Sequence, residues 1–157
     1  IEYISVIPTN IYGPNDNFDI KTGHVLPSLI HKCYLAEKNK TDLVIWGTGN
    51  PLREFIFSKD IAKLTEWALD NYTEDEPIIF STSDAVPIKD VVDLIVEYMN
   101  FKGNVVWDND KPDGQYRKPS SIKKLKSYLP DFQFTPIENG LKETIEWFYK
   151  NFETARR

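Results

Sequence analysis

The amino-acid sequence predicts an α/β fold, or a mixed α+β one, in which helices alternate with short strands. Five short runs rich in Ile, Val and Phe have the composition of strands, at residues 2–8, 42–46, 54–57, 77–81 and 104–107. Between and after these runs, apolar residues recur at the spacing of one helix face. The sequence shows no internal repeat or low-complexity tract, which indicates one compact domain over residues 1–157.

Five helices are expected from these apolar stripes. The first begins after His24, with Pro27 tolerated in its first turn. The second begins near Ser58 or Asp60, and Asp60 is expected to cap it. The third follows Pro87, and the last two follow residues 120–121 and 135–136. The side chains expected to face inward are, in chain order, Leu26, Leu29, Ile30, Cys33, Tyr34, Ile61, Leu64, Trp67, Ala68, Ile88, Val91, Val92, Ile95, Met99, Ile122, Leu125, Leu129, Ile137, Leu141, Ile145, Phe148 and Phe152.

Composition and charge narrow the class of protein. The chain is 41% hydrophobic and 27% charged, as is ordinary for a globular protein, and its net charge is −5. Negative charge argues against a nucleic acid or an anionic membrane as partner, because both are negative themselves. A single cysteine cannot form an internal disulfide, and the sequence has no apolar run of about 18 residues, so a cytoplasmic location is expected. Cys33 lies on an apolar helix face and His31 has no partner motif, so both are expected to be structural, and we expect no metal site.

The most informative stretch is Trp46-Gly-Thr-Gly-Asn-Pro-Leu-Arg53, directly before a predicted strand. A flat indole can stack on a base or sugar face, and the planar guanidinium of Arg53 matches the oxygens of a phosphate. The alternative is a strand that ends in a glycine-rich turn, with Trp46 in the core and Arg53 in solvent. The residues alone favour neither interpretation.

Two polar residues lie where the chain leaves a strand or enters a helix. Asn10 follows Pro8 at the end of the first predicted strand, and ligands of α/β sheets bind at such carboxyl ends. An Asx-turn without any ligand also accounts for Asn10, and composition alone favours that explanation. His24 opens the first helix and can serve acid–base chemistry or hydrogen-bond a cofactor. A lone histidine is more commonly a capping or surface residue.

A few charged residues complete the candidate ligand site. Lys32 lies two turns beyond His24 on about the same helix face and can bring an ammonium to a phosphate that His24 also approaches. Asp113 lies in a Pro-Asp-Gly turn and can accept two ribose hydroxyls or the amino groups of a guanine, and Lys118 adds a cation near it. The alternatives are a solvated helix lysine and an ordinary charged loop. With the indole and the guanidinium, these groups fit a nucleoside diphosphate.

Four motifs carry a resemblance to a known family. They are Pro-Thr-Asn-Ile-Tyr-Gly-Pro-Asn-Asp-Asn-Phe at 8–18, Gly-His-Val-Leu-Pro at 23–27, Trp-Gly-Thr-Gly-Asn-Pro-Leu-Arg-Glu-Phe at 46–55 and Lys-Pro-Asp-Gly at 111–114. In this order they closely resemble the GDP-L-fucose synthases, NADP-dependent epimerase-reductases of the extended short-chain dehydrogenase/reductase family. The resemblance implies a C-terminal substrate-binding lobe that lacks most of the Rossmann domain. Because the chain opens in an apolar run without a methionine, we expect residues 1–157 to begin at a strand of the missing half.

The resemblance also implies the roles of particular residues. Those that match contacts to the nicotinamide side of NADP are Pro8, Thr9, Asn10, Ile11 and His24. His24 also matches the acid of the epimerisation. Those that match contacts to the GDP-sugar are Lys32, Trp46, Arg53, Asp113 and, at a phosphate, Lys118.

The implied reaction converts GDP-4-keto-6-deoxy-D-mannose into GDP-L-fucose. A ketone at C4 acidifies the hydrogens at C3 and C5, so a base and an acid can invert both centres before NADPH delivers a hydride to C4. The chain contains no Gly-x-Gly-x-x-Gly, and its Tyr34 to Lys38 pair lies on the wrong side of the His24 motif, so the cofactor loop and the catalytic Tyr-x-x-x-Lys are expected in the missing half. We therefore expect the 157 residues alone to be inactive and monomeric, and the whole protein to be a homodimer.

Two alternatives stay open. The first is the substrate lobe of another nucleotide-sugar epimerase or dehydratase, which base specificity and the loop around Asp113 would distinguish. The second is a non-catalytic nucleotide-binding module. A glycine-rich strand–turn–helix upstream of the chain would argue against that module.

Overall fold

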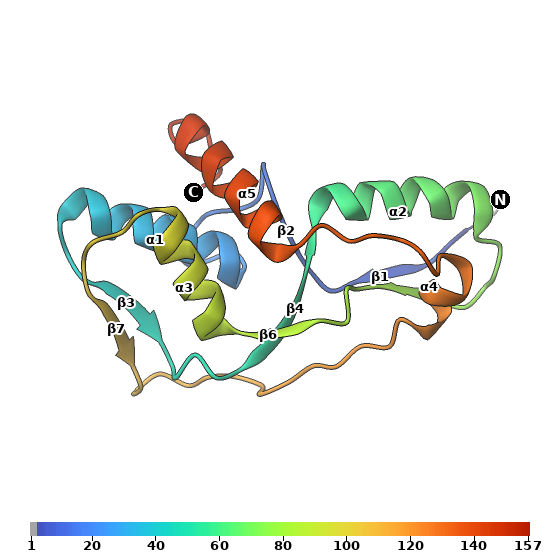
Figure 1. The fold of residues 1–157 in the computed structure, drawn as a ribbon, viewed down its shortest axis with the longest axis horizontal. Helices are drawn as coiled ribbons and strands as arrows, with labels where there is room; N and C mark the ends of the chain where they lie inside the picture. The colour runs from blue at the N-terminus through green and yellow to red at the C-terminus, as the bar shows by residue number, and fades with distance from the viewer. Residues whose placement is uncertain (1–2) are drawn as a thin grey trace.

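Helices and strands alternate through residues 3–157, the part of the chain that the computed structural model describes (Figure 1). The strands are β1 (Val6–Pro8), β2 (Asn10–Tyr12), β3 (Leu43–Trp46), β4 (Leu52–Phe57), β5 (Ile78–Phe80), β6 (Ala85–Pro87) and β7 (Val105–Asp108). The helices are α1 (Val25–Asn39), α2 (Ser58–Asn71), α3 (Ile88–Tyr98), α4 (Lys123–Tyr128) and α5 (Ile137–Asn151). None of these helices is long and apolar enough to cross a membrane. The α/β class predicted from the sequence is confirmed.

β4 is the central strand of a three-stranded sheet in the order β2–β4–β6. Its C-terminal half pairs in parallel with β2, so that Phe55 lies opposite Asn10. Its N-terminal half pairs antiparallel with β6, so that Arg53 lies opposite Val86. Two further parallel pairs, β1–β5 and β3–β7, form sheets of their own. Thr9 separates β1 from β2, and the chain changes there from the β5 sheet to the β4 sheet.

Two hydrophobic clusters lie on the two sides of β4. The larger one packs α1, α3 and α5 against β3 and β4, and the rings of Phe18 and Phe148 stack inside it with centroids 4.5 Å apart. The smaller one packs α2 and α4 against β5. Because successive side chains of a strand point to opposite faces, Phe55 and Phe57 enter the larger cluster and Ile56 enters the smaller. Figure 1 shows α2, α4 and β1 at one end of the molecule and α1, α3, β3 and β7 at the other.

The predicted helices are confirmed, and most of their expected inward faces are buried. Six of the predicted residues lie at the margins of the clusters and are only partly buried: Tyr34, Ile61, Trp67, Leu129, Ile137 and Phe152. β1 begins at Val6, and residue 2 of the predicted strand lies outside the described residues. β2 and β6 do not appear in the sequence prediction. Each has only three residues, and β6 ends in Pro87, so neither carries a run long enough to predict a strand.

The prediction that Asp60 caps α2 is wrong. The residue at the N-cap position is Phe57, and α2 has no side-chain cap hydrogen bond. The buried carboxylate of Asp60 accepts hydrogen bonds from the backbone N–H and the hydroxyl of Thr135, at 2.6 and 3.0 Å. Asp60 therefore ties α2 to the segment that precedes α5.

His31 and Cys33 have structural positions, as predicted. Both side chains are buried in the larger cluster or against it, and His31 Nδ1 lies 2.9 Å from the backbone oxygen of Phe18. Burial raises the pKa of the Cys33 thiol to about 12, and the negative charge of Glu37 adds to this effect. A thiol with so high a pKa is a poor nucleophile at neutral pH.

Candidate functional site

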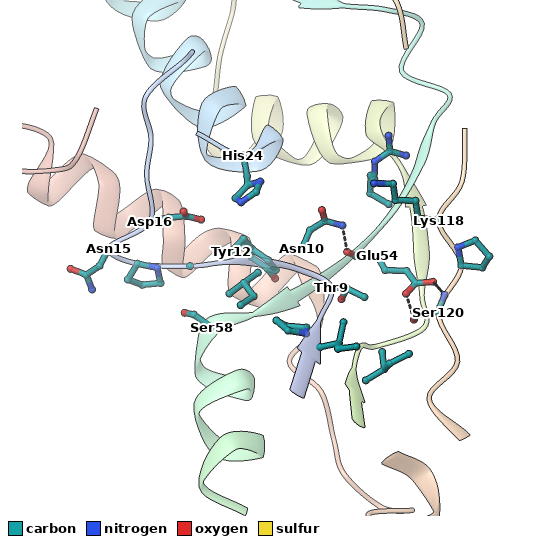
Figure 2. A pocket seen from close by; sticks show the side chains of 18 residues that line it. Thr9, Asn10, Tyr12, Asn15, Asp16, His24, Glu54, Ser58, Lys118 and Ser120 are labelled. Atoms are coloured by element: carbon teal, nitrogen blue, oxygen red, sulfur yellow. Dashed lines mark hydrogen bonds between the residues drawn. The ribbon is translucent and has the colours of Figure 1, made fainter. Parts of the chain in front are cut away.

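A cavity of about 740 Å³ opens where β1 ends and β2 begins. Its lining is formed by residues 7–16, His24, Arg53, Glu54, Ser58, Ile79 and residues 118–120. Figure 2 shows His24 and Asp16 on one side of Asn10, and Glu54, Lys118 and Ser120 on the other. The structure thus brings together all residues predicted to contact the cofactor, from Pro8 to Ile11 with His24, and adds Lys118 to them.

The polar side chains at the break between β1 and β2 differ in their hydrogen bonding. Asn10 Nδ2 donates to the backbone oxygen of Glu54 at 2.7 Å, so this side chain bridges to β4 and does not form an Asx-turn. The backbone N–H of Thr9 donates to Phe80 in β5 at 3.0 Å. The hydroxyl of Thr9 is buried and has no hydrogen-bond partner among residues 3–157. Because buried hydroxyls are normally paired, this atom marks a place where a ligand or a water completes the site.

The loop before α1, which internal hydrogen bonds hold in place, positions His24 at the cavity. The carboxylate of Asp19 accepts hydrogen bonds from the backbone N–H groups of Lys21 and Thr22, at 2.9 and 2.7 Å, and closes the turn before the helix. His24 occupies the N-cap position of α1 and its side chain makes no cap hydrogen bond, so the exposed imidazole faces the cavity. Asp16 lines the same cavity. Burial raises the pKa of Asp16, although a backbone hydrogen bond and the positive charges of His24 and Arg156 oppose that rise.

A second cavity of about 220 Å³ lies beside the first. Its lining is formed by Val25, Trp46, Gly49, Pro51, Arg53, Ile88 and Asp113. Arg53 lines both cavities, and its Nη1 donates to the backbone oxygen of Leu52 at 2.7 Å. The two cavities thus share Arg53, with His24 lining the larger and Trp46 the smaller. Three of the residues predicted to hold the substrate, Trp46, Arg53 and Asp113, converge here.

Asp113 already has partners in the loop between β3 and β4. Its two carboxylate oxygens accept hydrogen bonds from the backbone N–H and the hydroxyl of Thr48, at 2.6 and 2.7 Å. Gly47 has a φ of 81°, and a Cβ at this position would overlap the Asp113 side chain. The segment that carries Asp113 is thus fixed against the glycine-rich loop. Each carboxylate oxygen retains a second lone-pair direction for a ligand.

The indole of Trp46 is 62% exposed, which rules out the alternative of a core tryptophan. The ammonium of Lys32 lies 4.6 Å from its ring centroid, and that of Lys111 lies 5.9 Å from it. Lys32 lines neither of the two cavities described above, so in this arrangement it does not approach the same ligand group as His24. Partial burial lowers the pKa of Lys32.

Glu54 is a residue of the site that the sequence analysis does not identify. Its side chain is 3% exposed and lines the larger cavity. Burial alone would raise its pKa, but hydrogen bonds from Ser120 and Ser81 and the charge of Arg117 bring that pKa below its usual value. A carboxylate inside the apolar run 54–57 is the sequence signal that could have found it. Among residues 3–157, no group of three His, Cys, Asp or Glu side chains could hold a metal ion.

The sequence profile of the NAD dependent epimerase/dehydratase family matches residues 1–81, slightly more than half of the chain. The chain is 54% identical to the GDP-L-fucose synthase of Dictyostelium discoideum over 158 residues, which cover 99% of the chain and 49% of that protein. It is 34% identical to the GDP-L-fucose synthase of Escherichia coli (strain K12), covering 99% of the chain and 51% of that protein. The chain thus spans about half the length of these curated relatives.

Solved structures agree with the sequence relatives. The crystal structure of a GDP-L-fucose synthetase from Naegleria fowleri matches 98% of the chain and 48% of its own, with 49% identity and a TM-score of 0.96. A second crystal structure of that protein, bound to NADP, matches equally well. A UDP-N-acetylglucosamine 4-epimerase from Methanobrevibacter ruminantium, at 23% identity and a TM-score of 0.79, shows a similarity of fold alone.

Proposed function

Because this chain belongs to the NAD dependent epimerase/dehydratase family, we propose that it is the substrate-binding C-terminal part of a GDP-L-fucose synthase. The whole protein would convert GDP-4-keto-6-deoxy-D-mannose into GDP-L-fucose with NADPH. It would act as a homodimer in the cytoplasm, and residues 1–157 alone would be inactive. The 54% identity to the Dictyostelium discoideum enzyme, which extends over almost the whole chain, supports this assignment.

The two adjoining cavities suit different parts of the ligand, the smaller one the nucleoside and the larger one the sugar. The exposed ring of Trp46 would stack on the nucleoside, and Asp113 beside it would accept hydrogen bonds from the ribose or the base. Arg53 lines both cavities and would bind the diphosphate between nucleoside and sugar. Lys118 would add a second cation at the larger cavity, and Lys32, whose ammonium lies 4.6 Å from the ring centroid of Trp46, would contact the ligand beside that ring.

The strand end between β1 and β2 fits one edge of a bound NADP. The Thr9 hydroxyl is buried and has no hydrogen-bond partner within residues 3–157, so a polar group of the cofactor would complete its hydrogen bonding. Pro8, Asn10 and Ile11 line the same cavity and give it a mixed polar and apolar surface. NADPH, when bound, supplies the hydride that reduces the C4 ketone. The remaining contacts of NADP, including its phosphate-binding loop, would come from the part of the protein outside this chain.

His24 is the residue of this chain to which we assign a proton-transfer role. Its imidazole faces the larger cavity from the start of α1 and makes no cap hydrogen bond that would hold it elsewhere. A proton donated from this position to a sugar carbon would complete the inversion of a centre next to the ketone. Asp16 lines the same cavity, where burial raises its pKa and the positive charge of His24 acts against that rise.

The observation that carries the proposal is that Arg53 lines both cavities, within a chain that matches GDP-L-fucose synthases almost throughout. The test uses the full-length protein and follows the absorbance of NADPH after addition of GDP-4-keto-6-deoxy-D-mannose. We expect rapid oxidation with the GDP-sugar and little with the corresponding UDP-sugar. A folded, cofactor-bound protein that oxidises NADPH with neither sugar would contradict the proposal, and preference for the UDP-sugar would favour another epimerase of the family.

A variant of the acid tests the assignment of His24 within the same assay. His24→Ala should slow epimerisation at C3 and C5 more than it slows reduction of a ketone that is already epimerised. The physical reason is that the second step needs a hydride and a proton at oxygen, and no proton at carbon. Equal slowing of both steps would exclude His24 as the carbon acid.

A further inference from the structure

One extended segment, residues 111–120, runs beside the start of β4, where Arg117 forms a single parallel bridge with Leu52. It carries Asp113 and Lys118, the two loop residues of the proposed ligand site, and we call it the strap. Residues 111–119 are exposed, and no helix or strand longer than a single bridge lies within the segment. Its contacts with the rest of the chain are few. Thr48 bonds Asp113 near its start, the backbone N–H of Leu52 donates to Tyr116 in its middle at 2.8 Å, and Glu54 bonds Ser120 at its end.

Glu54 makes the last of these anchors. Glu54 Oε1 accepts a hydrogen bond from the backbone N–H of Ser120 at 3.1 Å, and Oε2 accepts another from the Ser120 hydroxyl. Oε2 also accepts a bond at 2.7 Å from the hydroxyl of Ser81, which follows β5. The carboxylate is buried, so each of these bonds forms in a medium of low dielectric constant, where losing an acceptor costs most.

The position of this anchor determines where Lys118 lies. Lys118 is two residues before Ser120, both line the larger cavity, and no hydrogen bond or ion pair of the Lys118 side chain is recorded among residues 3–157. The position of Lys118 at the cavity is therefore set by the path of the strap backbone. The nearby charge of Arg117 and the hydrogen bonds keep Glu54 ionised despite its burial, so the anchor persists at neutral pH.

We propose that Glu54 is a positioning residue that fixes the strap to β4 and so holds Lys118 at the larger cavity. The ligand part of this inference rests on the proposed function, because it requires a substrate phosphate for Lys118 to contact. The anchoring part rests only on the contacts of Glu54, Ser120 and Ser81.

The anchoring part is tested by limited proteolysis of the full-length protein without ligand. Within the strap, trypsin can cleave after Arg117 only, because Lys111 and Lys118 each precede a proline. Removing a buried, charged acceptor should free the strap, so we expect Glu54→Ala to speed cleavage at the Arg117–Lys118 bond about tenfold. Ser120→Ala should also speed it, by a smaller factor.

Two matched variants separate anchoring from general loss of stability. Ser81→Ala removes a hydrogen bond from the same carboxylate without touching the strap, and Glu66→Ala removes an exposed glutamate of α2. Neither should change cleavage after Arg117. An unchanged cleavage rate in both Glu54→Ala and Ser120→Ala would overturn the proposal. So would equal acceleration in Ser81→Ala and Ser120→Ala, because that result assigns Glu54 to the core rather than to the strap.

The ligand part is tested by kinetics with GDP-4-keto-6-deoxy-D-mannose. Glu54→Ala should raise KM about tenfold and change kcat much less, since a misplaced Lys118 loses a binding contact that is equal in ground and transition states. An unchanged KM, with cleavage accelerated as expected, would overturn the role of the anchor in ligand binding. If the wild-type protein does not bind the GDP-sugar at all, the proposed function fails, while the proteolysis still decides whether Glu54 anchors the strap.

Discussion

The two halves of β4 differ in partner, chemistry and purpose, although they are continuous in sequence. The N-terminal half, with Arg53 and Glu54, pairs antiparallel with β6 and directs charged side chains to the cavities. The C-terminal half, from Phe55 to Phe57, pairs in parallel with β2 and directs its side chains into the two hydrophobic clusters. One half therefore lines the cavities and the other packs in the hydrophobic clusters, and because both halves belong to one strand, the cavities keep a fixed register with the core.

This division has a physical reason. The first half of β4 pairs with a strand that ends at Pro87 and lines the cavities, where Arg53 is partly exposed and the buried carboxylate of Glu54 accepts hydrogen bonds from Ser81 and Ser120. The parallel partner β2 and helices on both sides enclose the second half, where only apolar side chains are stable. Substitutions in the two halves should therefore fail in different assays.

The largest effect is expected in the C-terminal half. Phe57 is buried in the larger cluster, and its ring lies 5.5 Å from that of Tyr12. Phe57→Ala leaves a cavity and removes this aromatic contact, which should lower the free energy of unfolding by about 4 kcal/mol. Chemical denaturation of the full-length protein measures the change. Phe57→Leu is the control and should cost much less, and a cost of Phe57→Ala below about 1 kcal/mol would break the comparison.

In the N-terminal half we expect a smaller effect, on ligand affinity rather than on stability. Arg53→Ala removes the cation shared by both cavities and should weaken binding of GDP about thirtyfold, or by about 2 kcal/mol, as measured by titration calorimetry. Its stability should change by less than about 0.5 kcal/mol. Arg53→Lys keeps the charge without the planar fork and should recover only part of the affinity. Unchanged GDP binding in Arg53→Ala would remove Arg53 from the site.

The smallest effect tests the face of β4 opposite Phe57. Ile56 is fully buried in the smaller cluster, and Ile56→Val deletes one methylene group from it, which should cost about 1 kcal/mol of unfolding free energy. The activity of the full-length protein should not change, because Ile56 does not line either cavity. A loss of activity larger than the loss of folded protein would show that the two functions of the strand are not separable.

Regular elements could be predicted from sequence where the pattern is long. The helices α1 to α5 each have an apolar stripe, which marks the face that packs against the core. Their positions therefore follow from the residues of each helix alone. β2 and β6 depend instead on β4, which each of them pairs with over three residues. Both strands are stabilised by pairing with a strand that is distant in the sequence, and a run of three residues does not indicate that pairing.

The candidate site shows the same limit. The sequence indicated Trp46, Arg53 and Asp113 as chemically suitable, and the structure brings them to one cavity. It did not indicate the Glu54–Ser120 anchor, because its partners are 66 residues apart. It also placed Lys32 with His24 from helix spacing, whereas the ammonium turns toward Trp46, which no periodicity within α1 can reveal.

Because Trp46 is exposed, its intrinsic fluorescence can report ligand binding at the smaller cavity. Its indole is exposed, whereas the other tryptophans of residues 1–157, Trp67, Trp107 and Trp147, are partly covered, so among these four a solute quencher such as acrylamide should act mainly on Trp46. Indole emission shifts to shorter wavelength when water leaves the ring. A nucleoside that stacks on Trp46 should therefore shift the quenchable part of the spectrum to the blue and shield it. The arrival of a ligand at the smaller cavity can then be followed by tryptophan fluorescence, without a label and without turnover.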